Sequence, residues 1–385
     1  DWEQRKFGEI YERASQKNDL TYGIDKIISV ANMYFKIDAT VGSEEYLKTY
    51  NVFKLGDIAF EGHTNKEYSY GRFVENTIGD GIVSHIFDVF TPRINLDINF
   101  WKDLIKYEPI MGPILRRCTK ASRMMSNLTS KEFLEEKILC PTLEEQKLIG
   151  EFIVRIDKNI TLHQRKLEHL NLKKKALLQK LFPKNGERYP ELRFPGFADA
   201  WEQRKLGDFT NQINIFVNPE DAKLPLWSLT AEAGLIEKSD RYERDFLVKK
   251  KDQFKRIETN TLVYNPMNIT IGSIDIYTGP YPIAVSGYYV SIVYDKNIDT
   301  DFLKEALLLP SSLKMYKNYA TGSLIERQRV QYPTFSKIQL LFPNFDEQKA
   351  IGQLFKSLNL NITLHQRKLE HLQLQKKALL QQLFI

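Results

Sequence analysis

Two nearly identical stretches dominate the sequence: "NITLHQRKLEHLNLKKKALLQKLF" (Asn159–Phe182) and "NITLHQRKLEHLQLQKKALLQQLF" (Asn361–Phe384). They lie 202 residues apart and differ only at Asn171/Gln373, Lys173/Gln375 and Lys180/Gln382. Shorter blocks recur too, since "WEQRKFGEI" at Trp2 returns as "WEQRKLGDF" at Trp201, and "PTLEEQKLIGEF" at Pro141 returns as "PNFDEQKAIGQL" at Pro343. The interiors between these blocks share little. Random divergence would change all parts of the two repeats to a similar degree. We therefore infer that the two conserved ends have the same function and that the two interiors have different functions.

Each repeat is predicted to end in one long helix. Thr142 with Glu145, and Asn344 with Glu347, are spaced for a capping box at its start. Roughly 38 residues at about 1.5 Å each make a rod about 57 Å long, which needs a partner. The twin helix, running antiparallel, is the expected partner. A 3,4 spacing predicts a coiled-coil seam, interrupted by His163, Lys174, His365 and Lys376, that comprises Ile160, Leu167, Leu170, Leu177, Leu181, Ile362, Leu369, Leu372, Leu379 and Leu383.

The chain of 385 residues, 42% hydrophobic, is expected to form at least two packed domains. Residues 1–140 and 200–342 mix short β-type runs with turn signals and end in helical stretches. We therefore expect an α+β fold, with two globular domains separated by a pair of long antiparallel coiled-coil helices and related by an internal pseudo-twofold repeat. The expected segments are domain 1 (1–140), helix 1 (141–185), linker and domain 2 (186–342), and helix 2 (343–385).

Composition narrows the class of protein. The net charge of +6 and pI of about 8.9 fit an anionic partner such as nucleic acid, although proteins without one reach similar values. Cys118 and Cys140 lack metal-site spacing, so we expect buried thiols in a reducing compartment. No apolar run approaches about 18 residues, which predicts a cytoplasmic protein without a membrane span. Because "DWEQRKFG" resembles the middle of "RFPGFADAWEQRKLG", the natural chain is expected to begin upstream of Asp1.

Signatures of catalysis are not found in the sequence. There is no GxxxxGK[ST] loop for ATP, and the six histidines form no HExxH or His/Cys cluster. "YNPM" (Tyr264–Met267) lacks the second proline and the aromatic residue of an amino-methyltransferase signature, and we interpret it as a turn. We therefore expect no catalytic, cofactor-binding or metal-binding residues on this chain.

Polar stretches of the interiors are candidates for DNA contacts. "NKEYSYGRFVEN" (Asn65–Asn76) and "TGSLIERQRVQY" (Thr321–Tyr332) combine side chains that read base edges with others that hold phosphates, although ordinary surface composition would look similar. The helices carry a strongly basic face, which suits a solvated surface, a phosphate backbone or another subunit. The candidate DNA contacts are Tyr68, Tyr70, Arg72, Asn76, Arg123, Asn265, Asn268, Tyr288, Thr321, Ser323, Arg327 and Arg329.

The ordered duplication resembles a known family. Pro141-x4-Gln146-x2-Ile149 and Pro343-x4-Gln348-x2-Ile351, each followed by a long basic heptad helix, are similar to the specificity subunits of type I restriction–modification systems. The "WEQRKLG" openings, "RFPGF" (Arg193–Phe197) and "GDGIVS" (Gly79–Ser84) resemble the same family. The resemblance covers essentially the whole chain, but the start at Asp1 lacks the "RFPGF" that precedes the second copy.

The resemblance implies a non-catalytic DNA-specificity subunit. Each target-recognition domain would read one half of a bipartite site in double-stranded DNA, while the helices set the spacer and dock two methyltransferase subunits. Motor–nuclease subunits would complete the restriction enzyme. The methyltransferases would bring S-adenosylmethionine and the motors ATP, so no cofactor is expected here. The alternatives are a coiled-coil adaptor that binds proteins only, and a DNA methyltransferase with an unrecognised site.

Overall fold

The computed structural model describes residues 2–37, 39–121, 125–184, 186–238, 253–322 and 328–384. The chain forms two compact units, each containing parts of both repeats. Unit 1 comprises residues 1–164 and 367–385, and unit 2 comprises residues 165–366. The division falls inside both long helices, α5 (Leu143–Leu181) and α10 (Phe345–Phe384), so each unit combines its own domain and helix start with the end of the other repeat's helix.

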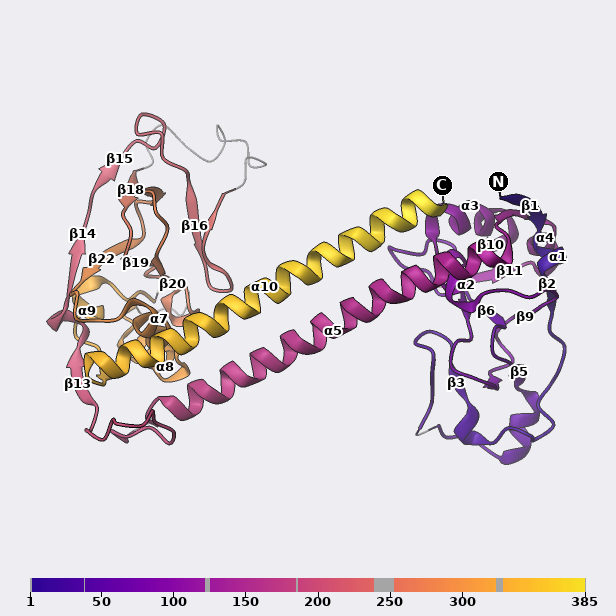
Figure 1. Ribbon diagram of the computed structural model, residues 1–385, viewed down its shortest axis with the longest axis horizontal. Coiled ribbons are helices and arrows are strands. Elements are labelled where there is room, and N and C mark those ends of the chain that lie inside the picture. Colours follow the sequence, from indigo (N-terminus) through magenta and orange to yellow (C-terminus); the bar gives the residue numbers. More distant parts are fainter. Residues whose placement is uncertain are drawn as a thin grey trace. The chain divides into compact units, whose positions relative to one another are not determined.

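Unit 1 is an α+β domain whose strands precede most of its helices (Figure 1). Its main sheet has the antiparallel order β2-β9-β6-β7, and β1 pairs with β12. Its elements are β1 (Glu3–Lys6), α1 (Phe7–Ile10), β2 (Tyr11–Arg13), η1 (Ile24–Lys26), β3 (Ile28–Ser29), β4 (Tyr34–Phe35), η2 (Glu44–Thr49), β5 (Asn51–Phe53), β6 (Ile58–Glu61), β7 (Arg72–Glu75), β8 (Gly81–Val83), β9 (Val89–Pro92), α2 (Ile98–Leu104), α3 (Glu108–Cys118), β10 (Thr119–Ala121), β11 (Ser126–Leu128), α4 (Ser130–Glu135) and β12 (Lys137–Cys140).

Unit 2 repeats this topology. Its main sheet has the order β14-β22-β19-β20, and β13 pairs with β23 as β1 pairs with β12. Its elements are β13 (Glu202–Lys205), η3 (Leu206–Asp208), β14 (Thr210–Ile213), β15 (Phe216–Val217), β16 (Trp227–Thr230), β17 (Gly234–Glu237), β18 (Phe254–Ile257), β19 (Thr261–Tyr264), η4 (Ile269–Ile271), β20 (Ile274–Tyr277), β21 (Ile283–Ser286), β22 (Val290–Tyr294), α7 (Thr300–Leu308), α8 (Pro310–Tyr319), α9 (Tyr332–Phe335) and β23 (Gln339–Phe342). The predicted α+β class with an internal repeat is thus confirmed.

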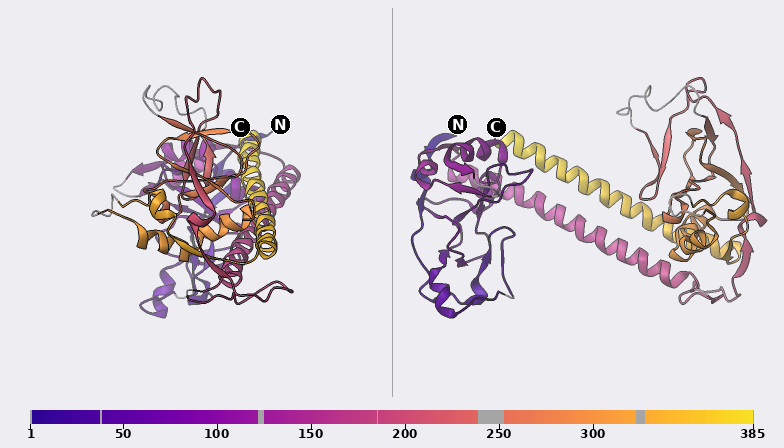
Figure 2. Two further views of the ribbon diagram at one scale, coloured as in Figure 1. Left: turned by 90° about the vertical axis from the view of Figure 1, so that its left-hand side faces the viewer. Right: turned by 180° about the vertical axis from the view of Figure 1, so that it is seen from behind.

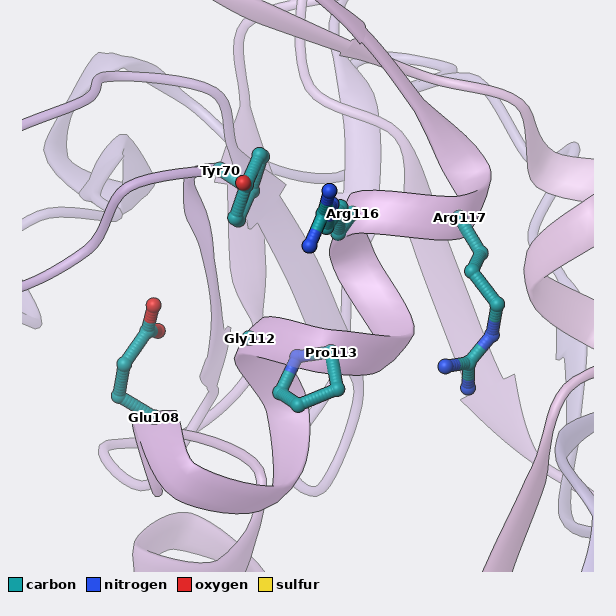
Figure 3. Close-up of a pocket in the computed structure, with 6 residues that line it drawn as sticks. All are labelled: Tyr70, Glu108, Gly112, Pro113, Arg116 and Arg117. Carbon is teal, nitrogen blue, oxygen red and sulfur yellow. The ribbon is translucent and has the colours of Figure 1, made fainter.

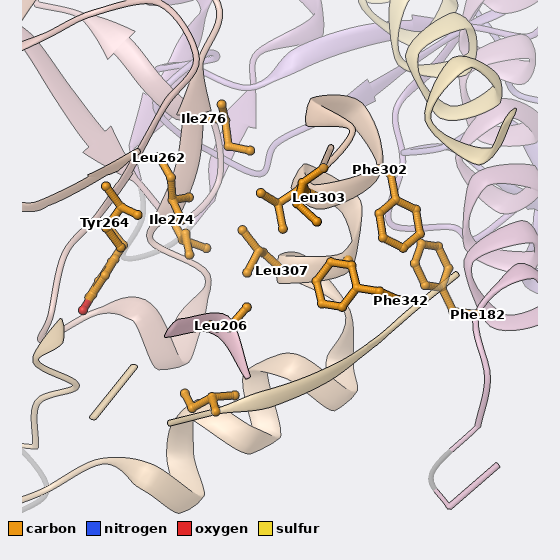
Figure 4. Close-up of a cluster of buried hydrophobic side chains, with 14 of the residues drawn as sticks. Phe182, Leu206, Leu262, Tyr264, Ile274, Ile276, Phe302, Leu303, Leu307 and Phe342 are labelled. Atoms are coloured by element: carbon orange, nitrogen blue, oxygen red, sulfur yellow. The ribbon is translucent and has the colours of Figure 1, made fainter. Parts of the chain in front are cut away.

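The cores lie between the main sheets and the helices that follow them. In unit 2, side chains of β19 and β20 meet α7, and Phe182 from the end of α5 joins the same cluster (Figure 4). In unit 1 the equivalent cluster includes Phe384 from the end of α10. The rings of Trp2 and Phe384 are 6.4 Å apart, so the two ends of the chain lie close together in this unit (Figure 2). Cys118 and Cys140 are buried free thiols, as expected.

The repeated "EQ" motif fastens each long helix to its own domain. Gln146 is buried, and its Oε1 accepts hydrogen bonds from Asp97 N (3.1 Å) and Trp101 Nε1 (3.0 Å), while its Nε2 donates to Pro141 O (3.0 Å). One turn further on, a Cβ on Gly150 would lie 2.3 Å from Asp97 Oδ1, so only glycine allows α5 to approach the start of α2.

The second copy of the motif makes the same bonds. Gln348 Oε1 accepts from Asp299 N (3.1 Å), and Gln348 Nε2 donates to Pro343 O (3.0 Å). Gly352 has the same close approach, here to Asp299 at the start of α7. The short repeated motif therefore forms a helix–helix junction in both units, although the rest of the two domains differs in sequence.

The helix caps form as predicted, with one correction. Glu145 N donates to Thr142 Oγ1 (3.3 Å), and Glu347 N donates to Asn344 Oδ1 (2.9 Å). The carboxylates that we assigned to capping boxes bind elsewhere. Glu145 accepts from Trp2 Nε1 (3.0 Å), and Glu347 accepts two bonds from Arg193 of the "RFPGF" segment (2.8 and 2.7 Å). These carboxylates join the helix start to the segment that leads into each domain.

Candidate nucleic-acid interface

Each unit brings two loops together beside its main sheet. In unit 1 the β6–β7 loop meets the β10–β11 hairpin, where Ser126 N donates to Gly62 O (2.7 Å) and His63 forms a bridge with Met125. In unit 2 the β19–β20 loop meets the segment between α8 and α9, where Val330 N donates to Pro266 O (3.0 Å). We call these the paired loops, residues 62–71 with 119–121 and 125–128, and residues 265–273 with 321–322 and 328–329. Their sequences differ while their positions in the fold correspond.

Most of the predicted DNA contacts fall on or beside the paired loops. Tyr68, Tyr70 and Arg72 belong to the first loop of unit 1 or to the strand that follows it. In unit 2, Asn265 and Asn268 lie on the first loop, and Thr321 and Arg329 form a β-bridge at the base of the second. Arg123, Ser323 and Arg327 lie outside the described residues. The paired loops of unit 2 thus bring together candidates that are distant in the sequence, such as Asn265 and Arg329.

Three candidates in unit 1 need correction, because their polar groups are already engaged. Asn76 is fully buried, and its Nδ2 donates to Phe53 O and Gly79 O (both 2.9 Å). Arg72 binds Glu61 (2.6 Å) and Ala31 O (2.9 Å), and its guanidinium covers the ring of the buried Tyr68 (5.1 Å). Asn76, Arg72 and Tyr68 therefore hold the β6–β7 region together. A polar residue type in a loop predicts such internal bonds as readily as DNA contacts.

Accessible candidates remain in both units. In unit 2 the guanidinium of Arg329 lies over the ring of Tyr288 (5.7 Å), and both side chains are exposed. Asn268 is also exposed, whereas Asn265 uses its Oδ1 to accept from Met267 N (3.1 Å). In unit 1, half-buried Tyr70 lines an open hollow of about 500 Å³ together with Arg116. Stacked Arg and Tyr side chains suit contacts with bases and phosphates.

The structure adds basic residues that we did not predict. Arg116 and Arg117 are exposed near the end of α3, next to the paired loops of unit 1 (Figure 3), and Lys120 is exposed on β10 within these loops. Lys314 and Lys317 are exposed on α8 of unit 2. Arg117 is tied to Glu136 (2.9 and 2.5 Å). Such positive groups beside the loops provide the electrostatic attraction that phosphates require. The dense run "RRCTKASR" was the signal in the sequence.

The predicted seam residues lie on the inner faces of α5 and α10. In unit 1, Leu372 is buried and Ile160, Leu369, Leu379 and Leu383 are half-buried. In unit 2, Leu170 and Leu181 are buried and Leu167, Leu177 and Ile362 are half-buried. Within each unit the two helices run antiparallel. In unit 1, Asp157 binds Lys376, and further along α10 Phe384 lies near Trp2, which donates to Glu145 at the start of α5. In unit 2, Phe182 after the end of α5 meets Phe355 near the start of α10.

The lysines that interrupt the seam form ion pairs. In unit 2, Lys174 Nζ lies 3.0 Å from Glu305 Oε1 on α7, and this carboxylate also accepts from Asn359 (2.7 Å). In unit 1, Lys376 Nζ lies 3.3 Å from Asp103 on α2 and 2.7 Å from Asp157 on α5. Burial lowers the pKa of Lys376, but Asp103 and Asp157 outweigh it and leave the pKa raised. Lys376 stays charged because the negative carboxylates of Asp103 and Asp157 favour its protonated form.

Among the described residues, no helix is long and apolar enough to cross a membrane, and no three or more acidic, histidine or cysteine side chains form a cluster suited to a metal.

Comparison with known proteins agrees with the resemblance predicted from the sequence. Residues 1–172 match the family model of the type I restriction modification DNA specificity domain. A protein assigned as the MjaX type I restriction enzyme specificity subunit of Methanocaldococcus jannaschii is 23% identical over 408 aligned positions, which cover 99% of this chain and 92% of that protein. The resemblance to specificity subunits of type I restriction–modification systems, predicted from the sequence, is therefore confirmed.

A solved structure shows the same fold. The S subunit of the type I restriction–modification system from M. genitalium aligns with a TM-score of 0.62 over 100% of this chain and 96% of that chain, at 13% identity. The agreement in fold persists although few side chains are shared. The two-domain α+β architecture with long helices is thus common to both proteins.

Proposed function

We propose that this chain gives a type I restriction–modification complex its DNA sequence specificity, and that each unit reads one half of a bipartite target through its paired loops. The chain itself is non-catalytic in this proposal. The long helices set the gap between half-sites and dock two methyltransferase subunits, which bring S-adenosylmethionine. Motor–nuclease subunits, which bring ATP, complete the restriction enzyme in the cytoplasm.

One observation carries the reading of two half-sites. Both units build paired loops at the same place in the fold, beside exposed basic residues, but with different side chains. Because the paired loops occupy the same place in each unit, each pair could face DNA in a similar way. Their different side chains would present different hydrogen-bonding groups to the base edges. Two domains of one topology with two different reading surfaces are what a bipartite, asymmetric target requires.

The outward face of the helices supports docking of two identical partners. Leu162 and its repeat equivalent Leu364 are 63% and 53% exposed, and Leu172 and Leu374 are 68% and 66% exposed. Arg165 and Arg367 lie on the same outward face, and all these residues recur without change. Exposed leucines that recur at the same positions within a basic face favour a protein partner, and the exact repetition favours two copies of the same one.

The test is a map of methylated bases. The chain would be co-expressed with its cognate methyltransferase in a host that lacks DNA methylation, and methylated adenines mapped across the genome. We expect one two-part motif with a fixed gap. Replacing residues 1–140 by another domain of the family should change one half of the motif and leave the other half unchanged.

Other outcomes would contradict the proposal. Methylation without a motif, or a stable complex that does not methylate, would favour an adaptor that binds proteins only. Methyl transfer by the purified chain alone would show a catalytic site. As a separate check, binding of the complex to its target should weaken steeply as salt rises, because cationic side chains displace counterions from phosphates.

A further inference from the structure

Helix α2 of unit 1 and its equivalent α7 of unit 2 each receive both long helices. The amino end of α2 is capped by Asp97 and bound by Gln146, so it holds the start of α5. Its other end carries Asp103, which binds Lys376 from the tail of α10. Helix α7 repeats this with Asp299 and Glu305. The shared pattern D-x-x-F-x-K-[DE], "DINFWKD" from Asp97 and "DTDFLKE" from Asp299, therefore marks a docking site for a tail, meaning residues 165–182 of α5 or 367–384 of α10.

The lysine contact favours one position of the tail on the docking site. Glu305 has a side chain only 5% exposed, and that of Asp103 is 15% exposed. If the tail slid by one heptad in either direction, Leu167 or Leu181 would replace Lys174, and Leu369 or Leu383 would replace Lys376. A buried carboxylate would then lose its cation, which is strongly destabilising because the charge is left unpaired. The leucine seam by itself is much less selective, because a heptad slip places leucine where leucine was.

An aromatic contact follows eight residues after each lysine. The ring of Phe182 is 5.5 Å from Phe302 and 5.7 Å from Trp201. The ring of Phe384 is 5.6 Å from Phe100 and 5.4 Å from Tyr107. Both phenylalanines are buried. The lysine contact and the aromatic contact thus form a two-point attachment with the same spacing in both tails.

We propose that this two-point attachment fixes where each tail docks, so that the gap between half-sites is set by the helix residues between the docking contacts, 158–173 in α5 and 360–375 in α10. Within each of these segments 16 residues separate the polar position near the helix's own domain (Asp157 or Asn359) from the lysine of the tail (Lys174 or Lys376). The inference rests on the proposed function. It differs from a simple coiled-coil ruler, in which any whole heptad added to the seam would have the same effect.

Two insertions of one heptad separate these ideas. The inner variant duplicates "HQRKLEH" (His163–His169) after His169, and likewise the identical heptad after His371, which leaves each lysine eight residues before its phenylalanine. The outer variant inserts the same heptad after Ala176 and after Ala378, which separates each lysine from its phenylalanine by 15 residues. Both insertions keep the leucine seam in frame and add the same residues, so each is the matched control of the other.

The inner variant, in complex with the methyltransferase, should methylate the same half-sites with a gap longer by about three base pairs, because seven residues add about 10 Å and a base-pair step is about 3.4 Å. The outer variant should lose the single gap and melt at a lower temperature. A rescue variant adds Lys174→Leu and Lys376→Leu to the outer variant and places lysine at the fifth inserted residue, eight before the phenylalanine. It should regain one motif with the longer gap of the inner variant.

Each result is decisive. If the outer variant gives the same single, longer gap as the inner variant, the seam alone sets the gap and the inference is wrong. An inner variant with an unchanged gap, or a rescue variant without a single gap, would also overturn it. If the unaltered chain gives no bipartite motif, the proposed function fails instead, which is a different observation.

Discussion

Units 1 and 2 share the same sheet topology and the same helix junctions, but their loops differ in sequence. The sheet order, the α2/α7 docking helix, the glutamine junction and the lysine contact occur in both. The paired loops differ in sequence between the units, and the smaller sheets differ in size, since unit 1 has the pair β5-β8 and unit 2 has β15-β18-β21. The comparison shows that the shared contacts hold the long helices to their domains, whereas the loops beside the main sheets are free to vary.

The largest expected effect comes from the phenylalanines that end the two tails. Phe182→Ala should destabilise unit 2 and Phe384→Ala should destabilise unit 1, each by about 3–5 kcal/mol, because a buried ring leaves a cavity among other aromatic side chains. Urea unfolding with hydrogen exchange on peptides from each unit would locate the loss. Leu172→Ala, at a side chain that is 68% exposed, is the control and should change stability little. Equal loss of protection in both units for either variant would contradict the assignment of one tail to each unit.

A second difference predicts that the stability of unit 1 depends on pH in a way that the stability of unit 2 does not. Glu75, at the end of β7, is 2% exposed, and its carboxylate accepts no hydrogen bond from the described residues. Burial raises the pKa of Glu75 to about 9 from an ordinary value of 4.5. Folded unit 1 then keeps a proton that the unfolded chain releases, so its stability should fall as pH rises from about 4.5 to 9, by roughly 1.4 kcal/mol per pH unit.

The corresponding end of β20 in unit 2 is Tyr277, so unit 2 should lack this slope. Glu75→Gln, which keeps the shape but cannot ionise, should flatten the profile of unit 1 between pH 6 and 8. The measurement is the free energy of unfolding of the wild-type chain and the variant at a series of pH values. Identical slopes for both would show that Glu75 does not carry the effect.

The glutamine junctions should differ in a graded way. Gln146→Leu leaves Asp97 N, Trp101 Nε1 and Pro141 O without their partner, whereas Gln348→Leu leaves only Asp299 N and Pro343 O. Each unpaired buried group costs about 1–3 kcal/mol, so both variants should be destabilised and Gln146→Leu more so. Thermal unfolding of the two variants in parallel measures this. A larger loss for Gln348→Leu would mean that Trp101 finds another acceptor.

The smallest expected effects are on DNA binding. Lys314→Ala with Lys317→Ala should weaken binding to all DNA sequences and lower the slope of log affinity against log salt by about 1 for each lysine that binds a phosphate. Arg329→Ala should instead weaken binding more at one half-site than at unrelated DNA, by about 1–3 kcal/mol. Fluorescence anisotropy of the methyltransferase complex with target and scrambled duplexes measures both. Lys48→Ala, at an exposed lysine of unit 1 that pairs with Glu45, is the control.

The repeat made much of the fold predictable. The long helices, their caps and their inner leucine faces follow from periodicity, since a 3,4 spacing places side chains on one face of a helix whatever the rest of the chain does. The strands before helices follow from alternating short runs and turn residues. The paired loops were only partly predictable. Tyr68, Arg72 and Asn76 have residue types that suit DNA contacts, but whether such groups face outward depends on the neighbours that fill the interior.

One of the three differences between the tails also has a structural reason. Lys180 lies 3.1 Å from Glu191 of the linker between α5 and β13, whereas the equivalent residue of α10 is Gln382. The linker alone supplies this carboxylate, so the lysine has a role in one copy only. The exchange could be seen in the sequence, but its reason required the position of residue 191.

The sequence by itself determined the duplicated helices, the α+β class of the domains and the resemblance to specificity subunits, because these depend on local periodicity and on motifs that can be compared within one chain. Only the tertiary structure showed that each tail completes the other repeat's domain, that the lysines within the seam face buried acids, and which polar loop residues remain accessible. These features join residues more than 100 positions apart, as Lys174 joins Glu305, and Lys376 joins Asp157. Such pairs leave no periodic trace along the chain, since which groups meet is decided by how the elements pack.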